Sequence, residues 1–209
     1  MMKVKRIEYH QVKRVGDCAL ALIGLTVLAA PFFLVALIIK LESDGPAIRR
    51  DKRVGKSGKH FVMYKFRTMT MNAPQKHPSE IDHSKYVTRF GSILRKSSFD
   101  ELPQLVNVLR GEMSLIGPRP APAREETTLK LRQRHGVLEL RPGVTGWAQV
   151  NGRDDVTDIE KVDYDHYYLN NLSFAMDCKC VVRTIGVVIT GSGITENTAE
   201  TVIKVNVKK

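Results

Sequence analysis

The chain of 209 residues has little cysteine: only Cys18, Cys178 and Cys180. A small and odd number of cysteines argues against a framework of disulfides and favours a reducing compartment. Cys178 and Cys180 are separated by one residue, and no histidine or further cysteine lies near them. A structural zinc site is therefore not expected.

Repeats and low-complexity segments are also absent, and acidic residues are fewer than basic ones. The hydrophobic content of 43% and the length indicate one folded domain with its own core. There are 33 lysines and arginines against 22 acidic residues, a net charge of +11. This excess favours polyanionic partners such as nucleic acid, anionic lipid or phosphorylated substrates. Nucleic acid is disfavoured, because neither aromatic platforms nor a recognisable reading helix is evident.

Residues 18–39 form an uncharged apolar run that is long enough to span a bilayer as a helix. Such a span is normally oriented by an excess of positive charge on its cytoplasmic side. Here the two flanks tie, so the rule gives no orientation for a single span, and it is satisfied if both ends stay in the cytoplasm. The flanking basic residues are Lys3, Lys5, Arg6, Lys13 and Arg14 before the run, and Lys40, Arg49, Arg50, Lys52 and Arg53 after it.

Pro31 lies inside this run and offers a way to keep both ends on one side. Proline removes a helical hydrogen bond and bends the axis, so the chain would enter one leaflet, turn near Ala30–Pro31 and return. A kinked spanning helix and a buried core helix stay open as alternatives. A cleaved signal peptide is disfavoured, because the apolar run continues through Pro31 without a clear cleavage site.

The turn Asp44–Gly45–Pro46 ends the membrane part, which gives three predicted regions: a membrane-associated segment (1–45), a cytoplasmic catalytic domain (46–190) and a C-terminal tail (191–209) without an assigned role. The alternating residues His60–Phe66 predict a strand, and the polar segment Met71–Lys85 predicts a surface loop. Apolar spacing predicts helices. They cover residues 99–109, with Leu102, Leu105, Val106 and Leu109 on one face, and residues 124–135, 159–170 and 178–190. The fold class expected is α+β and mainly helical.

The acidic pair Asp100–Glu101 is the most conspicuous chemical feature. It has a purely structural interpretation: Ser98 and Glu101 have the spacing of a capping box at a helix start. Pro103 fits that start poorly and would suit a helix that begins at Asp100. From these residues alone, a helix start and a catalytic site both stay open.

Several cations near this pair favour the catalytic interpretation. Gly117-Pro118-Arg119-Pro120 is a rigid turn that presents one guanidinium, which suits phosphate oxygens. A carboxylate among cations stays ionised and can act as a nucleophile or a metal ligand. A diphosphate substrate with a divalent metal fits this mixture. The other cations are Lys65 and Arg67 on the predicted strand, and Arg89, Arg95 and Lys96.

Two glycine-containing segments are further candidates. In residues 141–153, prolines and glycines fix turns while Gln149, Asn151 and Arg153 offer hydrogen bonds; Trp147 is expected in the core. Residues 53–59 resemble a phosphate loop in composition but lack its spacing, so nucleoside triphosphate binding is not expected.

Long ordered motifs resemble the bacterial sugar transferase family, the monotopic phosphoglycosyl transferases, and the length is typical of its small members. The resemblance covers nearly the whole chain. It is carried by Lys13-Arg14-x-x-Asp17, Arg53-Val-Gly, Lys65-Phe-Arg-Thr-Met, Asp100-Glu-Leu-Pro-Gln-Leu-x-Asn107-Val-Leu, Gly111-Glu-Met-Ser-Leu-Ile-Gly-Pro-Arg-Pro120, Arg141-Pro-Gly-x-Thr-Gly-Trp-Ala-Gln-Val-Asn-Gly-Arg153, Ser173 and Asp177.

The resemblance implies transfer of a sugar 1-phosphate from a UDP-sugar to undecaprenyl phosphate with release of UMP. Asp100 would form a covalent phosphosugar intermediate, and Glu101 beside it would help to hold Mg²⁺. Arg119, with Lys65 and Arg95, would bind substrate phosphate. The residues expected to contact the nucleotide sugar are Arg141, Gln149, Asn151 and Arg153. The resemblance also implies a re-entrant helix broken at Pro31 in the inner membrane of a bacterium, amphipathic interface helices and a catalytic domain facing the cytoplasm.

A different class of function explains less. A membrane-tethered protein that binds anionic lipid through its basic surface would account for the charge and the anchor. It would not account for an acidic pair between arginine-bearing turns.

Overall fold

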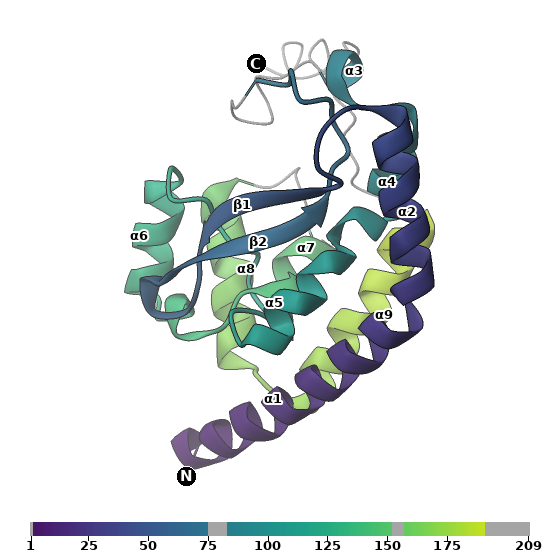
Figure 1. The fold of residues 1–209 in the computed structure, drawn as a ribbon. Coiled ribbons are helices and arrows are strands. Elements are labelled where there is room, and N and C mark those ends of the chain that lie inside the picture. The colour runs from purple at the N-terminus through teal and green to yellow at the C-terminus, as the bar shows by residue number, and fades with distance from the viewer. Residues whose placement is uncertain (1, 75–82, 152–156, 191–209) are drawn as a thin grey trace.

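The computed structural model describes residues 2–74, 83–151 and 157–190, and shows helices packed around two small sheets (Figure 1). The predicted class, α+β and mainly helical with a small β element, is confirmed. The helices are α1 (Met2–Val27), α2 (Ala29–Glu42), α3 (His83–Tyr86), α4 (Arg89–Lys96), α5 (Leu105–Arg110), α6 (Glu126–Arg134), α7 (Trp147–Asn151), α8 (Asp158–Asn170) and α9 (Phe174–Thr190). The strands are β1 (Ile48–Val54), β2 (His60–Phe66), β3 (Ser114–Ile116) and β4 (Gly143–Thr145), and the short 3₁₀ helices are η1 (Lys56–Gly58), η3 (Phe99–Gln104) and η4 (Val137–Glu139).

Helices α1 and α2 form a bent pair with an angle of 61° between them. The helix breaks at Leu28, one turn before the predicted position at Pro31. The reason is that Pro31 has no N–H to donate to the carbonyl of Val27, four residues earlier. Regular bonding resumes at once, since the Phe32 N–H donates to the Leu28 carbonyl at 2.8 Å. In the described part of the chain no single helix is long and apolar enough to cross a bilayer, whereas this pair is when taken together.

The bent pair packs on the rest of the protein through two apolar clusters. In the first, Ala21 of α1 lies among Phe61, Met63, Leu105, Val108 and Met113. In the second, Val35 and Ile39 of α2 pack with Ala47, Phe66 and Leu94. Figure 1 shows α1 running beside α9 before the chain turns into α2. Polar contacts join those two helices, because Asp177 accepts hydrogen bonds from Tyr9 at 2.6 Å and from Lys13 at 2.7 Å.

Strands β1 and β2 form an antiparallel hairpin in which Ile48 pairs with Phe66 and Val54 with His60. The bounds predicted for β2 are confirmed. Its partner β1 was not predicted, because its sequence IRRDKRV carries charge at five of seven positions and offers no apolar alternation. The parallel pair β3–β4 brings Gly143 against Gly117 so closely that a Cβ on Gly143 would collide with the Gly117 backbone.

The predicted helix over residues 99–109 is wrong in detail. It divides into η3 and α5, and Ser98 has a left-handed φ of 55° without the side-chain cap of a capping box. Of the predicted stripe only Leu105 is fully buried, and Leu109 packs partly buried beside it; the other fully buried side chains include Gln104, Asn107 and Val108. Asn107 explains the change, because its amide accepts a bond from Tyr64 N–H at 3.1 Å and donates to the Val62 carbonyl at 2.7 Å.

The other helix predictions are confirmed with adjusted ends, as α6, α8 and α9. The predicted surface loop is confirmed only in part: residues 71–74 form a turn and loop, and α3 begins at His83. Residues 75–82 of that loop, Arg153 and the predicted tail lie outside the described residues.

Candidate active site

Three separate elements bring Lys65, Glu101 and Arg119 together. Lys65 Nζ of β2 lies 2.6 Å from Glu101 Oε1 of η3, and Arg119 Nη2 lies 3.1 Å from the same oxygen. The Lys65 and Glu101 side chains are only 14% and 18% exposed, whereas that of Arg119 is 52% exposed. A largely buried pair, Lys65 and Glu101, thus lies beside one accessible cation, and Arg119 is placed to meet a ligand.

Asp100 is positioned by the turn that precedes it. The left-handed residue Ser98 ends the connection from α4 and starts η3. The ring of Phe99 then packs against two others: it stacks on Phe66 with centroids 6.4 Å apart and meets Phe32 edge-on at 5.9 Å. Phe32 belongs to α2, so the backbone next to Asp100 rests directly on the bent helix pair.

The two adjacent carboxyl groups have pKa values shifted in opposite directions. Burial, and secondarily the charge of Glu101, raises the pKa of Asp100 to about 6, against the opposing effect of Lys65, Arg95 and Arg119. Burial also opposes ionisation of Glu101, but Arg119 and Lys65 outweigh it and hold its pKa well below the usual range. The neighbouring cations favour the ionised form of both carboxyl groups, as expected. They outweigh burial at Glu101, whereas burial has the larger effect at Asp100.

Both carboxylates line a groove of about 2150 Å³ with the predicted cations Lys65, Arg95 and Arg119. Arg95 is held by its Nε, which donates to Thr68 Oγ1 at 2.9 Å. In the described chain, no hydrogen bond or ion pair engages the Asp100 carboxylate. A carboxylate that is ionised at neutral pH and free to approach a ligand can act as a nucleophile.

The glycine-containing segment of residues 141–153 contributes only in part to this groove. Gln149 lines the groove, and its Oε1 atom is buried without a hydrogen-bond partner in the described structure. Asn151 donates to the Trp147 carbonyl at 2.6 Å and accepts from Arg183. Trp147 is buried, as predicted. Among the predicted nucleotide-sugar residues in the described part of the chain, Gln149 is thus the one that lines the groove with Asp100.

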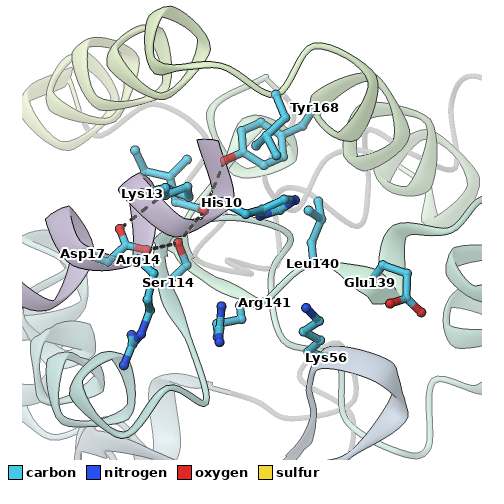
Figure 2. A pocket seen from close by; sticks show the side chains of 12 residues that line it. His10, Lys13, Arg14, Asp17, Lys56, Ser114, Glu139, Leu140, Arg141 and Tyr168 are labelled. Carbon is cyan, nitrogen blue, oxygen red and sulfur yellow. Dashed lines mark hydrogen bonds and ion pairs between the residues drawn. The ribbon is translucent and has the colours of Figure 1, made fainter. Parts of the chain in front are cut away.

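Arg141 lies elsewhere, in a second pocket of about 20 Å³, which has room for about one water molecule. Figure 2 shows this pocket, with Lys13, Arg14 and Asp17 of α1 on one side and Arg141 and Lys56 on another. Arg141 Nε donates to the Gly111 carbonyl at 2.9 Å, just after α5. Arg14 donates to the Leu109 carbonyl at 3.1 Å, so both cations stabilise the carboxyl end of that helix.

A divalent metal fits the pair of carboxylates only with help from a substrate. In the described residues, no group of three or more His, Cys, Asp and Glu side chains gathers to hold an ion. Mg²⁺ is, however, usually bound by one or two carboxylates together with substrate phosphates. Asp100 and Glu101 supply oxygen ligands of the right kind, although Lys65 already contacts one oxygen of Glu101.

Sequence reasoning missed the buried ion pair between Arg132 and Asp165. The two residues lie 33 positions apart, on α6 and α8, and no motif connects them. Arg132 also lines the groove. The only signals in the sequence were an arginine and an aspartate in predicted helices, where a solvated position is the usual expectation.

A groove lined by two carboxylates and several cations is suited to a phosphorylated substrate. Residues 8–191 match the sequence profile described as "Bacterial sugar transferase". The chain belongs to that family.

Several curated relatives carry named activities. The chain is 40% identical over 199 residues to "UDP-N-acetylgalactosamine-undecaprenyl-phosphate N-acetylgalactosaminephosphotransferase" of Aeromonas hydrophila, covering 88% of this chain and 45% of the relative. It is 39% identical over 196 residues to "UDP-glucose:undecaprenyl-phosphate glucose-1-phosphate transferase" of Xanthomonas campestris pv. campestris, covering 87% and 40%. The chain thus spans less than half the length of these two relatives. It covers 90% of the "Uncharacterized sugar transferase EpsL" of Bacillus subtilis, with 37% identity over 188 residues and 88% of this chain matched.

Proposed function

We propose that the protein is a polyprenyl-phosphate hexose-1-phosphate transferase, which moves a sugar 1-phosphate from a UDP-sugar to undecaprenyl phosphate. The observation that carries the proposal is the Asp100 carboxylate. It lies in the groove, free of hydrogen bonds in the described structure, beside the group formed by Glu101, Lys65 and Arg119. The substrate classes come from the names of relatives that match most of this chain.

In the first half-reaction, an oxygen of Asp100 attacks the phosphorus that carries the sugar. An Asp–phosphorus bond forms, the bond to the bridging oxygen breaks, and UMP leaves with that electron pair. In the second half-reaction, an oxygen of undecaprenyl phosphate attacks the same phosphorus and displaces Asp100 as a carboxylate. This is covalent catalysis in two displacements. The product begins the membrane-bound assembly of a glycoconjugate.

The other groups in the site bind charge. Arg119 is exposed and its planar fork suits phosphate oxygens, while Lys65 is fixed by its ion pair with Glu101. Arg95 adds a third cation along the groove. Mg²⁺ bound by Glu101 and Asp100 with substrate oxygens would neutralise the diphosphate and polarise it.

We further propose that the bent pair α1–α2 enters and leaves the same leaflet of the bacterial inner membrane, with the catalytic groove facing the cytoplasm. The bend of 61° and the basic residues on both flanks support this topology. Exposed apolar side chains on these helices and on α9 supply a surface for lipid. They include Leu20, Ile23, Val27, Phe33, Leu34, Leu37, Phe174, Val182, Ile185 and Ile189.

The test is UMP release by the full chain in detergent or nanodiscs, with Mg²⁺, undecaprenyl phosphate and a panel of UDP-sugars. With sugar-labelled donor and no lipid acceptor, label is expected on the protein at Asp100. Asp100→Asn is expected to lower turnover by at least about 10³-fold and to abolish the label. Asp163→Asn, an exposed aspartate on α8, is the matched control and should behave as the unaltered protein.

Two results would count against the proposal. Substantial turnover by Asp100→Asn would exclude the covalent route through this residue. Failure to release UMP from any UDP-sugar would favour a membrane-tethered protein that binds anionic lipid through its basic surface.

A further inference from the structure

The turn that presents Arg119 is held at four successive backbone carbonyls. Each of them accepts a hydrogen bond from a different donor, and Pro118 and Pro120 on either side of Arg119 are buried. The four bonds are Gly143 N–H to Pro118 O at 2.8 Å, Arg132 Nη1 to Arg119 O at 2.7 Å, Arg53 Nη1 to Pro120 O at 3.3 Å and Val54 N–H to Ala121 O at 2.9 Å. The backbone is thus fixed while the guanidinium of Arg119 stays accessible.

Only one of these bonds falls on the carbonyl of Arg119 itself, and it comes from a buried cation. Arg132 is 6% exposed and Asp165 is 1% exposed. Arg132 Nε and Nη2 donate to Asp165 Oδ2 at 3.0 and 2.7 Å, which leaves Nη1 for the Arg119 carbonyl. Figure 1 shows α6 and α8, which carry the pair, side by side.

Stability alone is a weak explanation for this arrangement. A buried ion pair pays a large desolvation cost and is often replaced by apolar residues without loss of stability. Its bond to Arg119 is more specific. A lysine at position 132 would offer one nitrogen in place of three, so it could not reproduce both contacts of the planar guanidinium.

We propose that Arg132 and Asp165 are positioning residues for the reaction. They fix the backbone of Arg119 so that its guanidinium meets both Glu101 and the phosphate of the substrate. Asp165 orients Arg132, and Arg132 acts on the reaction through its bond to the Arg119 carbonyl. The inference rests on the proposed function, because it assumes that Arg119 binds phosphate.

The test uses UDP as the probe, because it carries the diphosphate and avoids the choice of sugar. Its affinity for the full chain in detergent is measured by calorimetry. The variant replaces the pair together, Arg132→Met with Asp165→Leu, so that no buried charge is left alone. We expect an unfolding temperature close to that of the unaltered protein and UDP affinity lowered by about tenfold. The exposed pair Glu126–Lys130 on the same helix, replaced by two glutamines, is the control and should leave the affinity unchanged.

A double-mutant cycle that combines the paired replacement with Arg119→Ala separates a positioning role from a general disturbance of the fold. If the pair acts through Arg119, adding the paired replacement to Arg119→Ala lowers UDP affinity no further. If the two losses add, or if the paired variant binds UDP normally while Arg119→Ala binds weakly, the positioning role is wrong and the proposed function stands. If Arg119→Ala itself binds UDP and turns over normally, the phosphate role of Arg119 fails and the inference fails with it.

A loss of stability in the paired variant is handled by a second pair of measurements. The single variants Asp165→Glu and Asp165→Leu are compared. Asp165→Glu keeps the charge and is expected to lose less UDP affinity than Asp165→Leu. The proposal would be overturned if UDP affinity across these variants followed their unfolding temperatures and did not depend on whether Arg132 can bond to the Arg119 carbonyl.

Discussion

Asp100 and Glu101 are neighbours in the chain, yet their carboxyl groups ionise in different pH ranges. Burial raises the pKa of Asp100 to about 6, whereas Arg119 and Lys65 overcome burial and lower the pKa of Glu101. At pH 7 both are charged, roughly 90% in the case of Asp100. A carboxylate of raised pKa is the better nucleophile of the two, and the other is a permanent counter-charge for Lys65. The two adjacent acids are therefore suited to different tasks.

The first prediction concerns the pH dependence of the first half-reaction. In the proposed mechanism the phosphosugar intermediate forms from the Asp100 carboxylate, so its rate of formation should fall about tenfold for each pH unit below about 6. The measurement is the burst of UMP without undecaprenyl phosphate, because a phosphomonoester acceptor titrates in the same range. A rate that stays constant down to pH 4 would contradict the role of Asp100.

The second prediction tests why the rate falls at low pH, the acid limb of the pH–rate profile. Arg119 lowers the pKa of Asp100, so its removal in Arg119→Ala should move the acid limb to higher pH. The shift should be visible in the residual burst rate, whatever the loss in amplitude. Arg124→Ala, an exposed arginine near the same turn, is the control and should move the limb less. An unchanged limb in Arg119→Ala would show that this guanidinium does not face Asp100.

The third prediction is that Asp100→Asn makes the folded protein more stable. The folded pKa of Asp100 lies above its ordinary value of 3.8, so the ionised group costs stability at pH values above about 6. We expect a gain of about 1–3 kcal/mol at pH 7.5, shrinking through pH 6 to 4 and absent below pH 4. The gain is measured by denaturant unfolding at pH 7.5 and at pH 4, with Asp163→Asn as the control. A variant that is less stable at pH 7.5 would show that ionised Asp100 is held favourably.

Part of this site was predictable because it depends on short-range chemistry. The acidic pair, Lys65 on its strand and Arg119 between two prolines are all visible as local sequence patterns. The bounds of β2 followed from alternation, and the bend near Pro31 followed from the missing N–H of proline. In each case one segment contains all the information.

What was missed depends on contacts between distant segments. Asn107 turns the α5 face because it bonds to β2, more than forty positions away. Arg141 donates to the Gly111 carbonyl just after α5, and Arg132 donates to the Arg119 carbonyl. Both bonds join separate segments of the chain, so local patterns do not reveal them. The pKa of Asp100 follows from burial, which charge spacing along the chain does not report. Strand β1 was overlooked because a strand with charged residues at most positions is defined by its partner.

The fourth prediction is strong coupling between Lys65 and Glu101. Partial burial lowers the pKa of Lys65, and the charge of Glu101 opposes that shift. Glu101→Gln should therefore destabilise the fold and lower the pKa of Lys65 further, while Lys65→Met in the same chain should recover much of the loss. A double-mutant cycle is expected to give about 1–3 kcal/mol. The exposed pair Lys130–Glu126 should give less than about 0.5 kcal/mol, and equal values for both pairs would show that the Lys65–Glu101 contact is solvated.

The last prediction concerns the membrane topology. If the missing N–H of Pro31 produces the bend, Pro31→Leu restores a donor to the Val27 carbonyl and favours a straight helix, which is long enough to span. With a cysteine tag placed before Met1 in a chain whose three cysteines are replaced by serine, an impermeant maleimide should leave intact cells unlabelled. Pro31→Leu should expose the tag to the reagent in part of the molecules, whereas Ala30→Leu should not. Because Phe32 packs against Phe99 beside Asp100, we also expect Pro31→Leu to lower the rate of UMP release. Labelling of the unaltered protein in intact cells would exclude re-entry and leave a kinked spanning helix as the topology.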